Sequence, residues 1–211
     1  MSITNLTPRQ QLSAGRLPLR LANLFAGLTL YALAMAMLIR AQLGVDPWDV
    51  LHLGLANHVP LSLGTIVILV GALVLLAWIP LKQWPGLGTV ANTLYLGLAL
   101  DFFLRFFPAI DGLGWQVLVV ALAILVNGLG GALYIGSHFG AGPRDGLMTG
   151  LHLRTGLSIR LIRTVLELSV LGLGWLLGGP VGVGTVAYAL LIGPATQLFF
   201  RYTIVRLPQR T

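Results

Sequence analysis

The sequence predicts an all-α, polytopic membrane protein with six transmembrane helices, arranged as two inverted three-helix repeats that each carry a short interfacial or re-entrant helix. Composition is the first observation: 56% of the 211 residues are hydrophobic and only 9% are charged, against roughly a quarter in soluble domains. The second is the grouping of apolar residues into blocks of about 20, the length that crosses the hydrocarbon core of a bilayer. The third is a similarity of the chain to itself at an offset of 96 residues.

Six apolar blocks predict the membrane spans. They cover residues 21–39, 63–81, 87–106, 113–135, 159–177 and 183–202. Residues 1–211 are expected to form a single transmembrane domain, with tails at 1–18 and 204–211. The first block is longer than the apolar region of a signal peptide, so we interpret it as a retained helix. Because the spans occupy more than half of the chain, no separate soluble catalytic domain is expected.

The distribution of basic residues predicts the orientation of the spans. Lys and Arg near span ends concentrate on the cytoplasmic side of membrane proteins. With the N-terminus inside, 11 of the 13 basic residues fall on that side, and only Arg40 and Arg105 fall outside. Both termini are therefore predicted to be cytoplasmic. A net charge of +7 is explained by this bias and by anionic lipid, so no nucleic-acid partner is expected.

An internal repeat accounts for the plan of the chain. Residues 43–105 align without a gap with residues 139–201, and 22 of these 63 positions are identical. Repeat 1 is predicted over 19–108 and repeat 2 over 112–203. Because each repeat contains three spans, an odd number, the second repeat crosses the bilayer in the opposite direction. Inverted repeats are a recurring plan among secondary transporters, although structural inverted repeats without transport also exist.

A short helix is predicted in each repeat at a Pro-Asp segment. The segments read LGVDPWDVLHLGLA at 43–56 and FGAGPRDGLMTGLH at 139–152. Proline suits the first helical position, Asp46 is a good N-cap, and an aspartate two residues after the proline complements the positive end of the helix. About a dozen residues are too few to span a membrane. The helices therefore either lie at the interface or enter the bilayer and return.

Several of these segments resemble a known family. The motif LGVDPWDVLHLGL at 43–55, the segment Pro80-Leu81-Lys82 with PGLGT at 85–89, and Asn92 with Asp101 are similar to the YczE/YitT-like integral membrane proteins, a bacterial family of uncharacterised function. The resemblance covers the chain from about residue 16. It implies a multi-span protein of the bacterial cytoplasmic (inner) membrane and brings no established substrate.

Charged residues in or near the spans are the candidate site. Asp49 and Asp145 occupy equivalent repeat positions, and each either only caps its helix or also faces a substrate or ion pathway. Arg144 is either part of that pathway or one of the inward-facing positive charges. Trp48, its repeat counterpart, is interpreted as an interfacial anchor.

Two pairs of opposite charge at a four-residue spacing complete the candidate pathway. Glu167 lies within a span, four residues after Arg163, and this pair is either structural or couples a proton or substrate to transport. Asp101 and Arg105 have the same spacing near an outer span end, where a structural ion pair is favoured. The amide residues within the spans are interpreted as interhelical hydrogen-bonding residues: Asn23, Asn92, Asn127 and Gln197.

Several kinds of chemistry are not expected. The chain has no cysteine, and its four histidines show no metal-ligand spacing. No catalytic triad or carboxylate pair is recognisable, so we predict no enzyme, cofactor or metal.

The leading hypothesis is a small-solute transporter or permease with a site between the two halves. The alternative is a non-transporting accessory or scaffold protein that binds a membrane or secretion partner through its glycine-rich helix faces. Besides the lipid bilayer, the expected partners are a small molecule or ion, and a membrane protein or a second copy of the chain.

Overall fold

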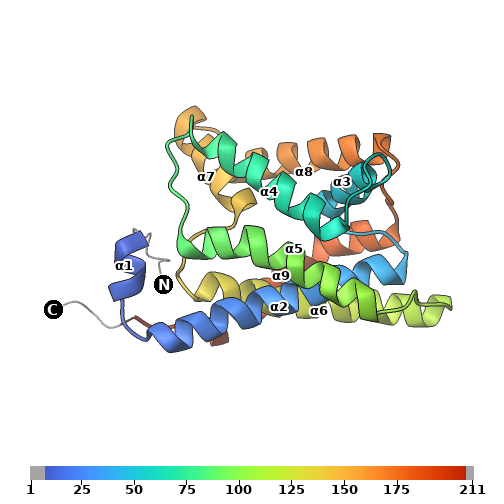
Figure 1. Ribbon diagram of the computed structural model, residues 1–211, viewed down its shortest axis with the longest axis horizontal. Coiled ribbons are helices and arrows are strands. Elements are labelled where there is room, and N and C mark those ends of the chain that lie inside the picture. The colour runs from blue at the N-terminus through green and yellow to red at the C-terminus, as the bar shows by residue number, and fades with distance from the viewer. Residues whose placement is uncertain (1–7, 208–211) are drawn as a thin grey trace.

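The computed structural model describes residues 8–207, and over this range the chain forms nine helices and no strand (Figure 1). The helices are α1 (Pro8–Ser13), α2 (Leu17–Ala41), α3 (Pro47–Ala56), α4 (Leu63–Trp78), α5 (Leu87–Phe106), α6 (Leu113–Gly136), α7 (Pro143–Thr155), α8 (Ile159–Leu176) and α9 (Val183–Thr203). The predicted all-α class is confirmed. Each of the six predicted spans coincides with a helix, and the two Pro-Asp segments form α3 and α7.

Four helices, α2, α5, α6 and α9, are long and apolar enough to cross a membrane. The other two predicted spans are weaker candidates. α4 is apolar but has 16 residues, and the 18 residues of α8 include Arg160, Arg163 and Glu167. Both begin at a serine N-cap, where Ser62 Oγ accepts from Thr65 N at 3.2 Å and Ser158 Oγ accepts from Leu161 N at 3.2 Å.

The four long helices form one side of the bundle, and α3, α4, α7 and α8 form the other (Figure 1). α2 packs against α5 and α6, and α6 packs against α9. On the opposite side α3 packs on α8 and α7 packs on α4. Each short helix thus contacts a helix from the other half of the chain, and the two short helices lie at opposite ends of the bundle (Figure 1).

Glycines bring α2 and α6 into close contact at the centre of the bundle. A Cβ atom added to Gly27 would lie 2.7 Å from the carbonyl oxygen of Gly130, and one added to Gly130 would lie 2.8 Å from the carbonyl oxygen of Gly27. Neither position has room for a side chain. Small residues allow helices to approach in this way in membranes, where packing replaces the hydrophobic effect as the source of association.

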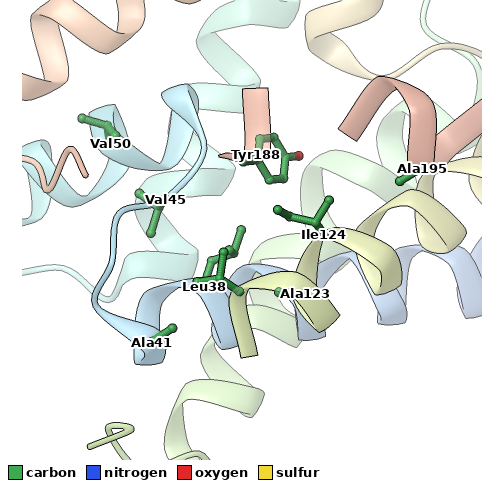
Figure 2. Packing of buried hydrophobic residues seen from close by; sticks show 9 residues of the cluster. Leu38, Ala41, Val45, Val50, Ala123, Ile124, Tyr188 and Ala195 are labelled. Carbon is green, nitrogen blue, oxygen red and sulfur yellow. The ribbon is translucent and has the colours of Figure 1, made fainter. Parts of the chain in front are cut away.

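Apolar side chains from α2, α3, α6 and α9 form a core cluster (Figure 2). Leu38 and Ala41 at the end of α2 meet Ala123 and Ile124 of α6, all less than 4% exposed. Tyr188 of α9 belongs to the same cluster. The first short helix is therefore held to the long helices by buried apolar contacts as well as by the chain itself.

A buried arginine fixes one end of the bundle. Arg20 is completely buried near the start of α2, and its guanidinium donates to the carbonyl oxygens of Gln11 at 2.6 Å, Ser137 at 2.9 Å and His138 at 3.0 Å. It also lies 4.3 Å from the ring centroid of Phe139. These contacts join the start of α2 to the segment after α6. A buried cation is tolerated here because its N–H groups are satisfied by carbonyl oxygens.

The segment that leads into each short helix hydrogen-bonds to the start of a long helix in the other half. Gly88 N donates to Phe139 O at 2.8 Å, and Gly184 N donates to Leu43 O at 2.7 Å. The two donors, Gly88 and Gly184, are 96 residues apart in the sequence, and so are the two acceptors, Leu43 and Phe139. The glycine after each acceptor, Gly44 or Gly140, has a φ of 104° or 106°, a conformation that favours glycine. The glycines that match in the repeat therefore have the same local role.

Candidate functional site

A cavity of about 350 Å³ lies between the two sides of the bundle. Residues from both halves of the chain line it. The polar ones from the first half include Tyr31, Asp46, Trp48, His52, Asn92 and Thr93. Those from the second half include Asn127, Tyr134, Arg144, Asp145, Arg163 and Glu167. The remaining walls are mostly apolar, as in typical small-molecule sites, and the volume lies within the usual range of about 300–1,000 Å³.

The two short helices point their N-termini at each other across this cavity. Asp46 caps α3, because its Oδ1 accepts from Trp48 N at 2.8 Å and from Asp49 N at 3.1 Å. The same oxygen lies 3.5 Å from Arg144 Nη1 in the first turn of α7. An ion pair thus joins the starts of two helices that are 96 residues apart in the sequence. The predicted cap at Asp46 is confirmed, and α3 and α7 both begin at the cavity and run outward from it toward opposite ends of the bundle.

Trp48 lines the cavity. The sequence favours an interfacial anchor, whereas the structure buries this side chain to 5% exposure. The Arg144 guanidinium lies over the indole ring, 4.8 Å from the ring centroid. The physical reason for the difference is that α3 turns inward, which removes Trp48 from the surface. Arg144 likewise points into the bundle and pairs with Asp46.

The two equivalent aspartates differ in their surroundings. Asp49 is fully buried, and its Oδ1 lies 2.9 Å from His52 Nδ1. Asp145 is exposed and lines the cavity. Within residues 8–207 it has no basic side chain at ion-pair distance. The cavity therefore contains one accessible carboxylate that lies in the field of Arg144 and Arg163 but forms no ion pair among the described residues.

Arg163 and Glu167 form the ion pair that their spacing predicts, with Arg163 Nε 2.8 Å from Glu167 Oε1. Both side chains line the cavity from α8. The pair is partly accessible, since the side chains are 52% and 30% exposed. The ion pair between Arg163 and Glu167 neutralises both charges on this part of α8.

Asp101 is not among the residues that line the cavity, and it forms no ion pair with Arg105, so the predicted ion pair is wrong. Its carboxylate accepts from Ser62 Oγ at 2.5 Å and from Gly64 N at 2.7 Å, both at the start of α4. The free N–H groups of a helix N-terminus attract a carboxylate. The sequence gives no indication of this contact, because the partners are 37 and 39 residues away.

Several cavity residues were not singled out as site residues from the sequence. Tyr31 and Tyr188 line the cavity, as do Asn92 and Asn127, which were interpreted as interhelical hydrogen-bonding residues. Within the described chain, Asn127 Nδ2 and Trp48 Nε1 are buried and have no hydrogen-bond acceptor. The repeat offset is the pattern that relates these residues: Tyr31 is the counterpart of Asn127, and Asn92 is the counterpart of Tyr188.

No group of three or more potential metal ligands occurs among residues 8–207. Arg144 pairs with Asp46 and Arg163 with Glu167, Asp145 has no such partner, and the aromatic and amide side chains of the cavity suit an organic molecule better than a bare ion.

A helical bundle with four membrane-length apolar helices and a polar cavity in its interior is characteristic of an integral membrane protein. The chain belongs to the family of unknown function DUF6198, whose model matches residues 18–201. It is 41% identical over 185 residues to an uncharacterized protein of Haemophilus influenzae, covering 88% of this chain and 84% of that one. The chain is therefore a membrane protein of this family.

Two relatives come from Bacillus subtilis. The uncharacterized membrane protein YczE is 35% identical over 179 residues, which cover 84% of this chain and 83% of YczE. The uncharacterized protein YyaS is 24% identical over 177 residues, covering 82% and 88% of the two chains. No solved structure matches the chain. The YczE-like resemblance noted from the sequence motifs is confirmed.

Proposed function

We propose that the protein is a small-solute transporter of the cytoplasmic membrane, built from two inverted three-span repeats with the substrate site in the central cavity. In this proposal α2, α4, α5, α6, α8 and α9 span the bilayer, and α3 and α7 are re-entrant. α4 has 16 residues and α8 has 18, so at 1.5 Å per residue they extend about 24 and 27 Å. These lengths suffice with slight thinning of the bilayer or with the help of flanking residues.

The exchange of contacts between the halves supports the inverted repeat. α3 packs on α8 as its counterpart α7 packs on α4, and α2 packs on α5 as α6 packs on α9. The crossed backbone bonds of Gly88 and Gly184 follow the same rule. A site on the axis between inverted repeats, at the N-termini of broken or re-entrant helices, is the arrangement expected of a secondary transporter.

One helix pair departs from this symmetry, and that difference carries the proposal. α4 and α5 are in close contact at the end of the bundle that contains Ser62, because a Cβ atom on Gly64 would overlap the carbonyl oxygen of Gly97. The equivalent helices α8 and α9 barely touch. Gly193, the counterpart of Gly97, has nothing within 4 Å of its Cβ position and lines the cavity.

The cavity consequently extends between α8 and α9, where Arg163 and Gln197 line it and are exposed. At the other end, the Asp101 contacts with α4 hold the α4–α5 pair shut. In an alternating-access transporter, each state has one of two equivalent gates open and the other closed. In this proposal the opposite state forms when α8 closes on α9 and α4 separates from α5.

In this proposal the open gate faces the cytoplasm, and the distribution of basic residues supports that orientation. Arg160 lies in the first turn of α8 and Arg201 in the last turn of α9, whereas Arg40 and Arg105 end α2 and α5 at the other side. Lys and Arg favour the cytoplasmic face. The structure thus corresponds to an inward-facing state in this proposal.

Cysteine labelling tests the proposal, because the chain has no native cysteine. A single Ile192→Cys variant places a thiol in the half-buried lining of the cavity. A membrane-impermeant maleimide is applied to intact cells and to inside-out vesicles. A transporter predicts fast labelling from the cytoplasm and slower labelling from outside, as the minor state is visited.

Two variants set the reference for each side: Asp111→Cys in the loop before α6 and Arg206→Cys after α9, both exposed. Each is expected to react from one side only. Labelling of position 192 from a single side, with both references behaving as expected, would contradict transport and favour the accessory or scaffold function.

A further inference from the structure

The charged side chains around the cavity are not balanced among residues 8–207. Four carboxylates, Asp46, Asp49, Asp145 and Glu167, face two guanidinium groups. Arg144 pairs with Asp46, and Arg163 pairs with Glu167. Asp49 is enclosed with His52. The remaining carboxylate, Asp145, lines the cavity without an ion pair among the described residues and is therefore available to a positively charged ligand.

Resting on the proposed function, we propose that the cavity binds a small organic cation that also carries a hydrogen-bond acceptor, with Asp145 as the counter-charge. Asp145 is the group that the ligand reaches, since it is exposed to the cavity and free of any ion pair among the described residues. Asp49 is 0% exposed and stands behind the lining.

The helix N-termini do not favour an anion here, although helix starts generally attract negative charge. The N-terminus of α3 is already capped by the Asp46 carboxylate. The first turn of α7 already contains Asp145. Arg144 is occupied by Asp46 and by the Trp48 ring. The positive groups in the cavity therefore have partners before any ligand enters.

Aromatic and apolar walls define an organic ligand rather than a metal ion. Trp48, Tyr31, Tyr134 and Tyr188 line the cavity, and aromatic faces attract ammonium groups that carry alkyl substituents. The volume of about 350 Å³ is far larger than a bare ion. The carboxylates of the cavity do not gather into a group of three or more potential ligands among the described residues, whereas an inorganic cation prefers a cage of several oxygen ligands.

Two hydrogen-bond donors without an acceptor among the described residues suggest that the ligand carries a hydrogen-bond acceptor. Asn127 is 1% exposed and Trp48 is 5% exposed, both line the cavity, and neither Asn127 Nδ2 nor Trp48 Nε1 has an acceptor among the described residues. Buried donors without a partner are costly. A hydroxyl, ether or carbonyl oxygen on the ligand would satisfy one or both.

Three probes of similar size separate charge from shape. Choline is a quaternary ammonium with a hydroxyl, 3,3-dimethyl-1-butanol is its uncharged isostere, and butyrate is an anion. Binding to the purified full chain in lipid nanodiscs is measured by calorimetry up to about 10 mM, where a site of millimolar affinity is occupied. We expect choline to bind, the neutral isostere to bind at least about tenfold more weakly, and butyrate not to bind. Equal binding of choline and its isostere, binding of butyrate alone, or no binding by choline would overturn the inference.

Variants assign the charge to one residue. Asp145→Asn is expected to weaken choline binding at least about tenfold, whereas Asp111→Asn, a neutralised carboxylate in an exposed loop, leaves it unchanged. Asn127→Ala is expected to weaken choline more than tetramethylammonium, which lacks the oxygen. Equal choline affinity in the two aspartate variants would refute the role of Asp145.

The outcome is separable from that of the transport test. Choline binding together with one-sided labelling of position 192 would leave a cation-binding membrane protein that does not transport. Two-sided labelling without choline binding would leave a transporter for another class of solute.

Discussion

Replacing Gly97 by alanine is expected to open the gate between α4 and α5. The new methyl group would overlap the Gly64 carbonyl oxygen and would lie 2.7 Å from Ile68 Cγ1. Ordinary contacts begin at 3.4 Å, so α4 must move away from α5 by roughly 0.7 Å or more. The backbone oxygen cannot rotate out of the way as a flexible side chain does.

The substitution destabilises the state of the protein in which α4 and α5 are in contact. Overpacking of this size costs about 1–3 kcal/mol, and it acts on the state in which the two helices touch. If the opposite state separates them, the ratio of the two states shifts by this amount. A change of about 1.4 kcal/mol alters the ratio about tenfold.

The matched control is Gly193→Ala at the equivalent position of the second repeat. Its methyl group has nothing within 4 Å in this state, so the variant tests the same chemical change without the overlap. Both substitutions are made in the Ile192→Cys background. External labelling is expected to become about tenfold faster with Gly97→Ala and not with Gly193→Ala. Equal rates in the two variants, with both folded by size-exclusion chromatography, would refute the reasoning.

Two further substitutions test other contacts. Asp101→Asn removes the charge on the carboxylate that accepts from Gly64 N. Because a charged hydrogen bond contributes more than a neutral one, we expect external labelling of position 192 to become about three- to tenfold faster. An unchanged rate would show that this carboxylate does not hold the gate closed. Arg20→Ala leaves three buried carbonyl oxygens, including that of His138, without their donor. Each unsatisfied buried group costs about 1–3 kcal/mol, so we expect a loss of about 3 kcal/mol or more of stability, seen as a lower thermal unfolding midpoint in detergent. Arg206→Ala, at an exposed arginine, is the control for the second change, and similar midpoints for the two alanine variants would show that the buried network contributes little.

Local chemistry made much of the helical plan predictable from the sequence. The apolar blocks gave the positions of the long helices, and proline with Asp46 gave the start of α3, because caps and proline act within one turn. The four-residue spacing of Arg163 and Glu167 gave their ion pair for the same reason. These features depend on residues that are close in the chain.

The candidate site depended on contacts that no local pattern contains. Arg144 meets Asp46 and Trp48 only because two helices from different halves turn inward and meet. Trp48 on a short amphipathic segment is equally compatible with the membrane interface, which is why the surface position was favoured. The repeat offset related these residues as counterparts, but it does not say that counterparts touch.

Asp101 illustrates the same limit at the gate. Its spacing to Arg105 is as good as that of Arg163 to Glu167, yet it contacts the start of α4 instead. A helix N-terminus with free N–H groups outcompetes a flexible neighbour when tertiary packing brings it close. That packing comes from Gly64 and Gly97, whose lack of side chains allows the close approach.

The most direct test of two alternating gates is to measure the distance across each gate with a pair of spin labels. Spin labels at positions 61 and 102 report the α4–α5 gate, and labels at positions 157 and 198, each 96 residues later, report the α8–α9 gate; all four side chains are exposed. Pulsed electron resonance is recorded in nanodiscs for each pair, with and without Gly97→Ala. Alternating access predicts that this substitution lengthens the first distance and shortens the second. A change confined to the first pair, with the second distance unmoved, would contradict the coupling of the two gates and with it the proposed mechanism of transport.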